Sequence, residues 1–272
     1  MSRDDGPPPT SRADFHSHLI PGVDDGAERE VNSRAALSAF RRHGIRRVIT
    51  TPHFTASIAL NERALHARLD EIDFGWTVLD GLARAEFPDV QVGRGVEVLL
   101  DHPEPQLGDR RLRLGGGRFV LVEYSFGGIP PNSALPLRAI RAQGFVPVIA
   151  HPERYVDVAA RLSVVRQWLD AGAFLQVNLG SIVGEYGSGP KRVALKLLQD
   201  GVVSYLSSDY HARGDFRFEP TATSFARLRA GRQFEMLTIT NPCRLMDGMD
   251  PLPVPPIPSE GFLDRVKRTL RV

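Results

Sequence analysis

The sequence lacks the features that define several large classes of protein. It has one cysteine, Cys243, in 272 residues, which excludes an internal disulfide. No apolar run approaches the roughly 18 to 20 residues needed to span a bilayer. Its 34 lysines and arginines almost balance its 32 aspartates and glutamates, and the net charge of +2 is too small to favour nucleic-acid binding as the main activity.

Two common phosphate-handling motifs are also absent. Arg244 follows Cys243 directly, so there is no Cys-x5-Arg loop and cysteine-based phosphatase chemistry is excluded. No Gly-x-x-x-x-Gly-Lys-Ser/Thr sequence occurs, and the three glycines at 115–117 precede a predicted strand, where a turn explains them better than phosphate binding. Because Cys243 follows Pro242, we interpret it as a small buried side chain near the start of a helix.

The length and the ends of the chain predict one catalytic domain with two appended segments. With 42% hydrophobic content, 272 residues can bury a single large core, expected over residues 13–250. Residues 1–12 are polar and lack the apolar core of a secretory signal, so we expect a flexible N-terminal extension and a cytoplasmic protein. Residues 251–272 are expected to form a proline-rich linker and a short basic segment. The basic part, residues 262–272, is compatible with an amphipathic helix on a partner, a membrane surface or the domain itself.

What the sequence does contain is a concentration of metal-ligand side chains. His16 and His18 lie two residues apart, and in an extended strand residues i and i+2 project from the same face, so both imidazoles can bind one ion. A Pro-Gly-Val-Asp-Asp-Gly turn follows and adds the carboxylates of Asp24 and Asp25. This spacing predicts a metal site.

Further residues of the same kind follow short apolar runs along the chain. They are His53, Glu97, Glu123, His151, Asp209 and His211. The runs are rich in β-branched residues and are separated by longer helical stretches, which is typical of buried parallel strands in βα units. Side chains at the carboxyl ends of such strands lie where barrel enzymes have their active sites, so the pattern predicts one site built from many segments.

The order of the predicted elements indicates an α/β barrel with seven βα units, one fewer than the usual eight. Strands are predicted near residues 13, 47, 91, 119, 146, 174 and 203. Helices are predicted over residues 28–43, 61–86, 132–143, 159–171 and 190–200. Gly144, Gly172 and Gly201 follow the last three helices, where glycine commonly ends a helix. The side chains predicted to form the core stripe of the first helical region are Val31, Ala35, Ala39 and Ile45.

Several blocks of the sequence carry a family resemblance. They are Asp14 to Ala27, Thr51 to His53, Gly95 to Glu97, His151 to Tyr155 and Ser208 to His211. In this order, over about residues 12–248, they resemble the polymerase-and-histidinol-phosphatase (PHP) superfamily, and within it the bacterial metal-dependent protein-tyrosine phosphatases of capsule and exopolysaccharide synthesis. The Leu-Gln-Val-Asn run at residues 175–178 favours the same branch. The resemblance implies a distorted (β/α)7 TIM-like barrel, the PHP fold.

The resemblance also implies which residues hold metal ions. The ligands of the first ion would be His16, His18, Glu97 and Asp209, those of the second Glu97, Glu123 and His151, and those of the third Asp25, His53 and His211. Asp25 is preferred to Asp24 because the family ligand is the acid directly before the glycine. All donors are imidazole or carboxylate, which suits Mn²⁺, Fe or Zn²⁺. From the family we expect Mn²⁺, with two to three ions per chain.

Arginines and aromatic residues are the expected substrate contacts. Arg154 is expected to bind phosphate through bidentate hydrogen bonds, the alternative being a salt bridge to Glu153. The family has a second arginine near the strand that ends at Asp209, and both Arg213 and Arg217 fit that position. The aromatic side chains that could line a slot for a phenolic ring are Tyr124, Phe126, Tyr155 and Tyr186.

The implied activity is phosphotyrosine hydrolysis by water that metal ions activate. The expected partner is a phosphotyrosine protein, most simply a bacterial tyrosine kinase of capsular or exopolysaccharide synthesis, with membrane association only through a membrane-bound partner. Three alternatives stay open: a small-molecule phosphatase of the histidinol-phosphate type, a nuclease or polymerase-associated module, and a non-catalytic regulatory module. The near-neutral charge disfavours a nucleic-acid partner, and the complete ligand set disfavours loss of catalysis.

Overall fold

The computed structural model of the chain describes residues 11–156, 158 and 162–259, so the basic C-terminal segment and most of the predicted N-terminal extension lie outside it. The strands are β1 (Arg12–Asp14), β2 (Ile45–Thr50), β3 (His53–Thr55), β4 (Gln91–Arg94), β5 (Glu97–Leu99), β6 (Phe119–Glu123), β7 (Val146–Ala150), β8 (Phe174–Asn178) and β9 (Tyr205–Ser207). The α-helices are α1 (Glu30–Arg42), α2 (Glu62–Glu86), α3 (Ala134–Ala142), α5 (Ser163–Asp170), α6 (Leu179–Val183), α7 (Ser188–Gln199), α8 (Phe218–Arg227), α9 (Gly231–Glu235) and α10 (Asn241–Met246).

The strands pair in parallel and form two sheets that continue into each other. The strand orders are β1-β2-β4 and β3-β5-β6-β7-β8-β9. Short irregular links join β2 to β3 and β4 to β5, and hydrogen bonds cross them: the Gly95 N–H donates to the Thr50 carbonyl and the Glu97 N–H to the Pro52 carbonyl, both at 3.0 Å. Pro52 has no N–H to offer a ladder, which accounts for a break at that point. The seven predicted strand regions are therefore present, two of them interrupted.

The sheet closes where the segments after β1 and β9 meet. Ser17 and Tyr210 form a parallel bridge. The His18 N–H donates to the Tyr210 carbonyl at 2.9 Å, and the Asp209 N–H donates to the His16 carbonyl at 2.8 Å. These contacts complete the distorted seven-stranded barrel that the sequence predicted.

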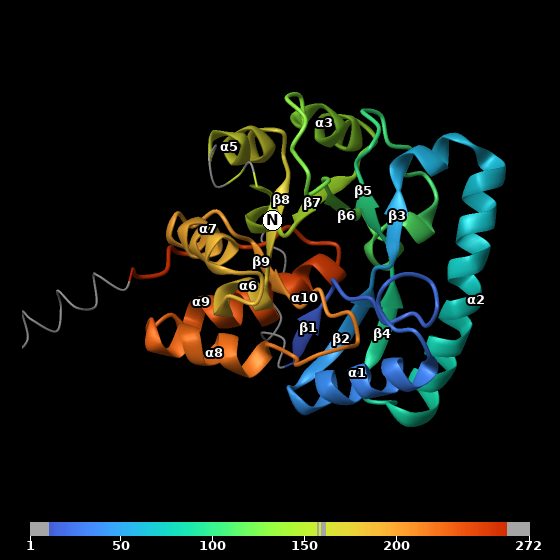
Figure 1. Cartoon of the computed structure of the whole chain (residues 1–272), viewed down its shortest axis with the longest axis horizontal. Coiled ribbons are helices and arrows are strands. Elements are labelled where there is room, and N and C mark those ends of the chain that lie inside the picture. Colours follow the sequence, from blue (N-terminus) through green and yellow to red (C-terminus); the bar gives the residue numbers. More distant parts are fainter. Residues whose placement is uncertain (1–10, 157, 159–161, 260–272) are drawn as a thin grey trace, which may run out of the picture.

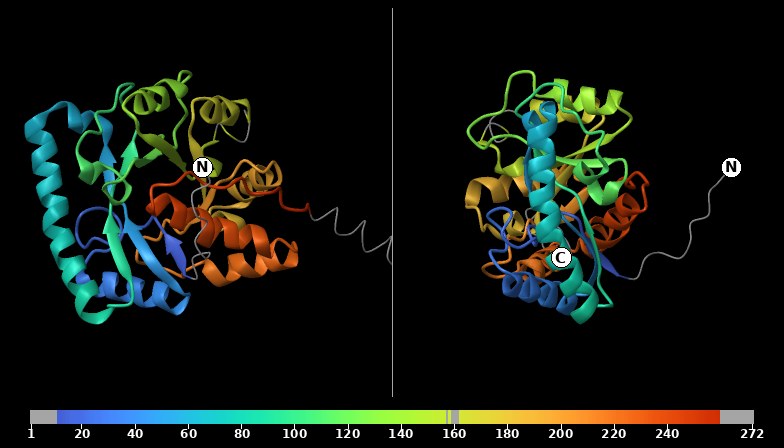
Figure 2. Two further views of the ribbon diagram at one scale, coloured as in Figure 1. Left: turned by 180° about the vertical axis from the view of Figure 1, so that it is seen from behind. Right: turned by 90° about the vertical axis from the view of Figure 1, so that its right-hand side faces the viewer.

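The helices lie around the outside of the strands (Figures 1 and 2), and the long helix α2 forms one side of the molecule. Gly144, Gly172 and Gly201 follow α3, α5 and α7 with φ angles of 84°, 83° and 68°, so the predicted glycine helix ends are confirmed. In the described part of the chain, no helix combines the length and the apolar character needed to cross a membrane.

The core stripe predicted for the first helical region is confirmed for Ala39 and Ile45, which are buried, and wrong for Val31 and Ala35. Val31 is 51% exposed and Ala35 is also exposed, whereas Phe40 is fully buried. Ser33 takes a core position because its hydroxyl donates a hydrogen bond to the Leu19 carbonyl at 2.8 Å, which removes most of the cost of burying it. A satisfied polar residue therefore lies on the inner face of α1, together with the apolar residues Ala36, Leu37, Ala39 and Phe40.

A hydrophobic cluster from several strands lies beneath the carboxyl end of β6. Phe119, Leu121 and Glu123 alternate along that strand, so they share one face. Phe119 and Leu121 belong to the cluster, together with Tyr205 of β9 and Leu245 of α10. The carboxylate of Glu123 therefore stands at the end of a face that is otherwise apolar.

The C-terminal part of the described chain packs on the barrel. Cys243 in α10 is 1% exposed, as predicted for a small buried side chain. The segment after α10 is extended, and its Val254 and Ile257 side chains are buried. The side-chain amide of Asn241 accepts from the Leu252 N–H at 2.8 Å and donates to the Leu252 carbonyl at 2.9 Å. These contacts hold the proline-rich segment against the domain.

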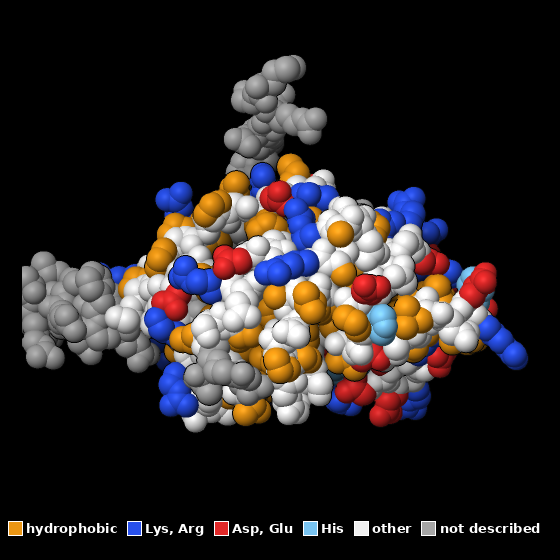
Figure 3. Space-filling model, turned by 90° about the horizontal axis from the view of Figure 1, so that it is seen from above, with side chains coloured by type: hydrophobic (Ala, Val, Ile, Leu, Met, Phe, Trp, Pro, Cys, Tyr) orange, Lys and Arg blue, Asp and Glu red, His pale blue; other side chains and the backbone are white. Residues whose placement is uncertain are grey.

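On the face drawn in Figure 3, basic and acidic side chains are interspersed among apolar ones. This mixed surface agrees with the near balance of charge in the sequence. Nucleic-acid binding proteins usually gather their basic side chains into a patch or stripe, so this face does not favour such a partner.

Candidate metal centre

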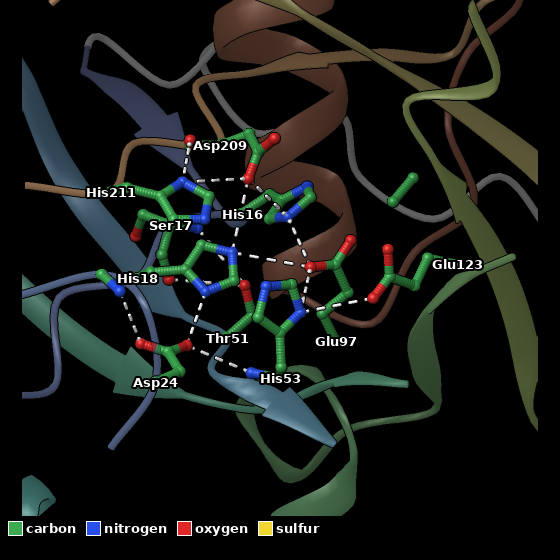
Figure 4. Close-up of polar contacts among 12 residues, drawn as sticks. His16, Ser17, His18, Asp24, Thr51, His53, Glu97, Glu123, Asp209 and His211 are labelled. Atoms are coloured by element: carbon green, nitrogen blue, oxygen red, sulfur yellow. Dashed lines mark hydrogen bonds and ion pairs between the residues drawn. The ribbon is translucent and has the colours of Figure 1, made fainter. Parts of the chain in front are cut away.

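The predicted metal ligands gather at one end of the barrel, and Figure 4 labels all of them except Asp25 and His151. They come from the segment after β1 (His16, His18), the loop before α1 (Asp25), β3 (His53), β5 (Glu97), β6 (Glu123), the residue after β7 (His151) and the segment after β9 (Asp209, His211). His53 and Glu97 are the first residues of β3 and β5, just after the breaks that follow β2 and β4, and Glu123 is the last residue of β6. Parallel strands of one sheet end at the same edge, so segments that are far apart in the sequence converge there.

Four of these residues form a buried group: His16, His18, Glu97 and Asp209. Nε2 of His16 lies 3.3 Å from Glu97 Oε2 and 3.2 Å from Asp209 Oδ1. Nε2 of His18 lies 3.5 Å and 3.3 Å from the same two oxygens. Ligands placed tetrahedrally at about 2.1 Å from an ion are about 3.4 Å apart. The observed separations therefore suit one divalent ion.

Three atoms of this group have no hydrogen-bond partner within the described residues. They are Nε2 of His16, Nε2 of His18 and Oε2 of Glu97, and all are buried. Buried polar atoms are nearly always paired, and leaving one unpaired costs about 1 to 3 kcal/mol. A cation between them would satisfy all three atoms. The residues present therefore fit a metal ion by their packing as well as by their chemistry.

A second group contains His53, Glu97 and Glu123. Nδ1 of His53 lies 3.2 Å from Glu97 Oε2 and 3.3 Å from Glu123 Oε1. His151 stands beside the same carboxylates, with its Nε2 2.9 Å from Glu97 Oε1 and 3.9 Å from Glu123 Oε2. Glu97 thus faces both groups, as a bridging ligand must. Of the two histidines, His53 lies nearer to Glu123 and His151 lies farther from it.

A third group lies closer to the surface and contains His18, Asp25, His53 and His211. Oδ1 of Asp25 lies 3.4 Å from His53 Nε2 and 3.3 Å from His211 Nε2. The Asp25 side chain is 57% exposed. His53 presents one ring nitrogen to this group and the other to the second group. The third group is therefore the one that meets solvent.

Asp24 supports the centre from outside these groups. Its Oδ2 accepts from His18 Nδ1 at 2.7 Å and from the His53 backbone N–H at 3.2 Å, while its Oδ1 accepts from the Gly26 N–H at 3.0 Å. The bond to Nδ1 leaves Nε2 of His18 available for a metal ion. Gly26 is required here because a Cβ atom would lie 2.2 Å from the His18 carbonyl oxygen.

The electrostatics of the centre favour positive charge. Burial alone lowers the pKa of His16, but Glu97 and Asp209 raise it to about 10. Burial also lowers the pKa of His53, and Glu123 and Glu97 raise it to about 10. Burial raises the pKa of Asp209, but the nearby histidines, His16 first, hold it well below its usual range. In the metal-free protein the imidazoles of His16 and His53 therefore carry protons that bound cations would displace.

Arg154 reaches into the first group. Its Nη1 donates to Asp209 Oδ2 at 2.7 Å. Its guanidinium carbon lies 4.6 Å from the ring centre of Phe126 and 4.2 Å from that of Tyr186. Stacking between two aromatic faces holds the plane of the guanidinium and leaves its edge to make hydrogen bonds.

The alternative salt bridge between Arg154 and Glu153 is not formed. Oε1 of Glu153 instead accepts from the Ser181 hydroxyl at 2.6 Å and from the Asn178 N–H at 3.0 Å. Glu153 therefore ties the turn after β7 to the segment after β8.

The two other candidate arginines have different surroundings. Nη2 of Arg213 lies 3.5 Å from Asp25 Oδ2, at the edge of the third group. Arg217 is paired with Glu185 at 3.2 Å and with Asp215 at 3.4 Å. Both arginines line a pocket of about 480 Å³ that opens beside the centre. Other residues that line it are Asp25, Arg154, Tyr186, Asp209 and His211.

Two of the four aromatic residues predicted to line a slot are buried. Tyr124 and Tyr155 are each 1% exposed, and the Tyr155 hydroxyl donates to the Ala150 carbonyl at 2.8 Å. Phe126 is 42% exposed, and Tyr186 lines the pocket. The prediction is therefore wrong for Tyr124 and Tyr155, which pack inside the domain.

Sequence reasoning gave no role to two amides of β8 that adjoin the centre. Gln176 Oε1 lies 2.9 Å from His16 Nδ1, and Asn178 Nδ2 donates to Asp209 Oδ2 at 2.7 Å. Both amide side chains are fully buried. The available signal was their i, i+2 spacing in an otherwise apolar strand.

Known proteins share this sequence and architecture. The tyrosine-protein phosphatase YwqE of Bacillus subtilis (strain 168) is 29% identical over 201 residues, which cover 73% of this chain and 76% of that protein. The tyrosine-protein phosphatase CpsB of Streptococcus pneumoniae is 27% identical over 205 residues, covering 73% of this chain and 82% of that protein. A crystal structure from work on YwqE and CpsB, described there as unique metal-dependent tyrosine phosphatases, has a TM-score of 0.75 at 25% identity, covering 91% of this chain and 99% of that one.

A sequence model of a protein family also matches this chain, over almost the whole barrel. The sequence model described as capsular polysaccharide synthesis, CpsB/CapC, matches residues 12–247. This range contains all the residues of the three groups described above. The chain therefore belongs to the CpsB/CapC family of capsular polysaccharide synthesis.

Proposed function

We propose that this chain is a metal-dependent protein-tyrosine phosphatase, a phosphoric monoester hydrolase. The observation that carries the proposal is the set of buried, unpaired donor atoms of His16, His18 and Glu97, with Arg154 directly beside them. Cations and a guanidinium on one side of a pocket suit the oxygens of a phosphate monoester. The names of the related YwqE and CpsB proteins support phosphotyrosine as the substrate.

The three groups are proposed to hold two to three divalent ions. When bound, such ions lower the pKa of a water molecule and offset the charge of the phosphoryl oxygens. The proposed ligands are His16, His18, Glu97 and Asp209 for the first ion, Glu97, Glu123 and His151 for the second, and Asp25, His53 and His211 for the third. The donors suit Mn²⁺, Fe or Zn²⁺, and we propose Mn²⁺ from the family resemblance.

Arg154 and Arg213 are proposed to bind the phosphate. Arg154 has one donor engaged by Asp209, and its aromatic neighbours orient the rest of the fork. Arg213 is 62% exposed, lies at the edge of the third group and lines the same pocket as Arg154, so it can reach a phosphate bound there. Arg217 is held by two carboxylates, and we assign it to the wall of the pocket.

Phosphotyrosine suits this site for a chemical reason. A phenolate is a better leaving group than an alkoxide because the phenol pKa is near 10, and our assignment includes no general acid. The rings of Phe126 and Tyr186 beside Arg154 provide apolar contact for a phenyl ring. We expect phosphotyrosine peptides to be hydrolysed at least about tenfold more efficiently than phosphoserine peptides, equivalent to about 1.4 kcal/mol.

The substrate is tested by measuring kcat/KM of the Mn²⁺-loaded protein for four compounds. They are a phosphotyrosine peptide, the matched phosphoserine peptide, histidinol phosphate and single-stranded DNA. A preference for histidinol phosphate over the phosphotyrosine peptide replaces the proposal with the small-molecule alternative. Efficient cleavage of DNA replaces it with the nuclease alternative.

Metal dependence is tested on the same protein. Chelation should abolish hydrolysis and Mn²⁺ should restore it. Asp209→Ala or His151→Ala should lower the rate on the order of a hundredfold or more, because the charge that develops at phosphorus loses its stabilisation. Full activity in metal-free protein contradicts the mechanism.

We further propose that the substrate protein is a tyrosine kinase of capsular or exopolysaccharide synthesis. The family match supports this choice. Deleting the gene should raise phosphotyrosine on that kinase, and the phosphatase should sediment with membranes only when a membrane-bound kinase is present. Unchanged kinase phosphorylation would contradict the proposal.

A further inference from the structure

Two buried amides, Gln176 and Asn178, have no part in the reaction proposed above. They lie two residues apart on β8, so their side chains project from the same face of the strand. Both are fully buried. A buried amide is tolerated when its oxygen and nitrogen have partners, and the partners of these two residues lead to the metal centre.

A continuous series of hydrogen bonds joins them to the first metal group. Nδ1 of His16 lies 2.9 Å from Gln176 Oε1. Nε2 of Gln176 donates to Asn178 Oδ1 at 2.8 Å, and Nδ2 of Asn178 donates to Asp209 Oδ2 at 2.7 Å. The series therefore begins at one candidate ligand of the first ion and ends at another.

The direction of the series follows from its carboxylate end. An ionised Asp209 can only accept, so Asn178 must present its NH₂ group to it and its oxygen to Gln176. Gln176 must then present its own NH₂ group to Asn178 and its oxygen to His16. An amide oxygen only accepts, so Nδ1 of His16 must carry the proton. When a bound cation displaces the second proton of His16, the lone pair is therefore left on Nε2.

That nitrogen is the one that faces the centre. Nε2 of His16 lies 3.3 Å from Glu97 Oε2 and 3.2 Å from Asp209 Oδ1, and it has no hydrogen-bond partner within the described residues. At the other end, Asn178 and Arg154 both donate to Oδ2 of Asp209, each at 2.7 Å, which leaves Oδ1 turned toward the two histidines. One series thus orients a nitrogen ligand and an oxygen ligand together.

We propose that Gln176 and Asn178 are positioning residues that set the tautomer of His16 and the rotamer of Asp209 for the first metal ion. The inference rests on the metal site of the proposed function. Gln176 thus has for His16 the role that Asp24 has for His18, whose Nδ1 lies 2.7 Å from Asp24 Oδ2. Partners of this kind commonly change metal affinity by ten- to a hundredfold.

The fold does not depend on these side chains for its strand pairing. β8 is paired in parallel with β7 and β9 through backbone hydrogen bonds. The backbone N–H of Asn178 is also held by Glu153 Oε1 at 3.0 Å. Substitutions of the two amides can therefore test orientation with the backbone still supported.

The decisive comparison is between Gln176→Met and Gln176→Glu. A positioning role and a simple packing role predict opposite answers to which of the two variants binds metal more tightly. Met has a similar size and is apolar, so a packing role predicts near-normal metal affinity for Met and a loss for the buried charge of Glu. A positioning role predicts the reverse, because Glu keeps an acceptor for His16 Nδ1 and Met does not. We expect Gln176→Met to weaken Mn²⁺ binding by ten- to a hundredfold, and Gln176→Glu, which keeps the acceptor for His16 and loses the donor to Asn178, to weaken it less.

Metal affinity is measured by competition with a chelator, and the tautomer by ¹⁵N NMR of the Zn²⁺-loaded protein. The wild type and Gln176→Glu should show a protected Nδ1–H signal for His16, and Gln176→Met should lose it. Asn178→Leu should also weaken Mn²⁺ binding. The control is Asn241→Leu, a fully buried amide of α10 bonded to Ser204 and Leu252, which should lower the melting temperature and leave metal affinity unchanged.

The outcomes separate this inference from the proposed function. A wild type that binds metal, together with unchanged affinity and an unchanged Nδ1–H signal in Gln176→Met, overturns the positioning role and leaves the phosphatase proposal intact. Tighter metal binding in Gln176→Met than in Gln176→Glu, the result that a packing role predicts, also overturns it. A wild type that binds no metal overturns both.

Discussion

At the scale of single residues, unusual backbone conformations coincide with the candidate ligands. His151 and Asp209 have φ angles of 35° and 52°, a region that non-glycine residues rarely occupy. Such conformations cost on the order of 1 to 3 kcal/mol each and persist where the surroundings enforce them. His151 directly follows β7, Asp209 lies two residues after the end of β9, and both side chains turn toward the centre. The strain is therefore located where the proposed chemistry needs it.

Replacing Arg154 should separate phosphate binding from metal binding. Arg154→Ala removes the proposed phosphate contact but no metal ligand, so kcat/KM should fall by roughly ten- to a thousandfold, about 1.4 to 4 kcal/mol. The metal content should be unchanged because Asn178 still donates to Asp209 Oδ2 and links that ligand to His16 through Gln176. Arg154→Lys should recover little because an ammonium group lacks the bidentate fork. Steady-state kinetics and metal analysis provide the measurement.

Arg213 and Arg217 form a matched pair for the same assay. Arg213→Ala should lower kcat/KM, while Arg217→Ala should change it by less than about threefold, or under about 0.7 kcal/mol, because Arg217 is engaged by Glu185 and Asp215. Wild-type rates in both Arg154 variants would show that Arg154 is structural, and a larger loss in Arg217→Ala would reverse the assignment of the second arginine.

We expect the thiol of Cys243 to be unreactive and to take no part in catalysis. Its side chain is buried in α10, and burial raises the pKa of its thiol, so little thiolate forms near neutral pH. Cys243→Ser should leave turnover almost unchanged, and iodoacetamide should react slowly with the native protein at pH 7.5. Strong inactivation by either change would restore a thiolate mechanism to consideration.

At the scale of elements, the interrupted strands keep their register across the breaks. Thr50 pairs with Arg94 in β2 and β4, and His53 pairs with Glu97 in β3 and β5. The separation is 94 − 50 = 44 residues before the break and 97 − 53 = 44 after it, so no residue is gained or lost. The sheet bends without slipping, and two candidate ligands remain side by side.

The turn before α1 gives an element-scale prediction. In Gly26→Ala, the added methyl carbon would lie 2.2 Å from the His18 carbonyl oxygen and 2.4 Å from the His18 Cβ, so the turn must move. Metal affinity should fall by at least about tenfold, about 1.4 kcal/mol, with a lower melting temperature, because the movement displaces His18. Calorimetry and chelator competition measure the two effects.

Gly81→Ala is the matched control. Gly81 lies in α2, and a Cβ atom added there meets nothing within 4 Å. It should stabilise the protein by up to about 1 kcal/mol, because alanine has the higher helix propensity, and leave metal affinity unchanged. Equal metal binding in both glycine variants would contradict the role given to the turn.

At the scale of the whole molecule, the centre couples metal binding to folding. Its ligands come from both ends of the barrel sequence, from His16 to His211, so the unfolded chain offers no comparable site. A ligand that binds only the native state stabilises it by about 2.7 kcal/mol at a hundred times its Kd. The separated segments are thus held together by the same contacts that the reaction requires.

Stability should depend on pH mainly in the metal-free protein. The pKa values of His16 and His53 rise from 6.5 to about 10 in the folded state, so the folded protein holds more protons than the unfolded chain between these values. This stabilisation is complete below pH 6.5 and is lost as the pH rises through 10. Melting temperatures of chelated protein should therefore fall by several degrees between pH 7 and pH 9.5.

The metal-saturated protein provides the comparison, because its imidazoles are neutral ligands at every pH of the series. Its melting temperature should fall less over the same range. Parallel curves for the two forms would contradict the charge assignment of the centre.

Features that depend on a few neighbouring residues could be predicted from the sequence alone. Seven strand regions, the glycine helix ends and the positions of the candidate ligands at strand ends follow from periodicity, capping and motif spacing, which act over a few residues. Tertiary structure decided the rest, because it depends on distances between segments that no local period encodes. Ser33 could be buried on the inner face of α1 because its hydroxyl donates to the Leu19 carbonyl, and Tyr155 was buried by packing of the domain. The position of His53 between two groups likewise required the folded barrel, since the carboxylates it faces are dozens of residues away in sequence.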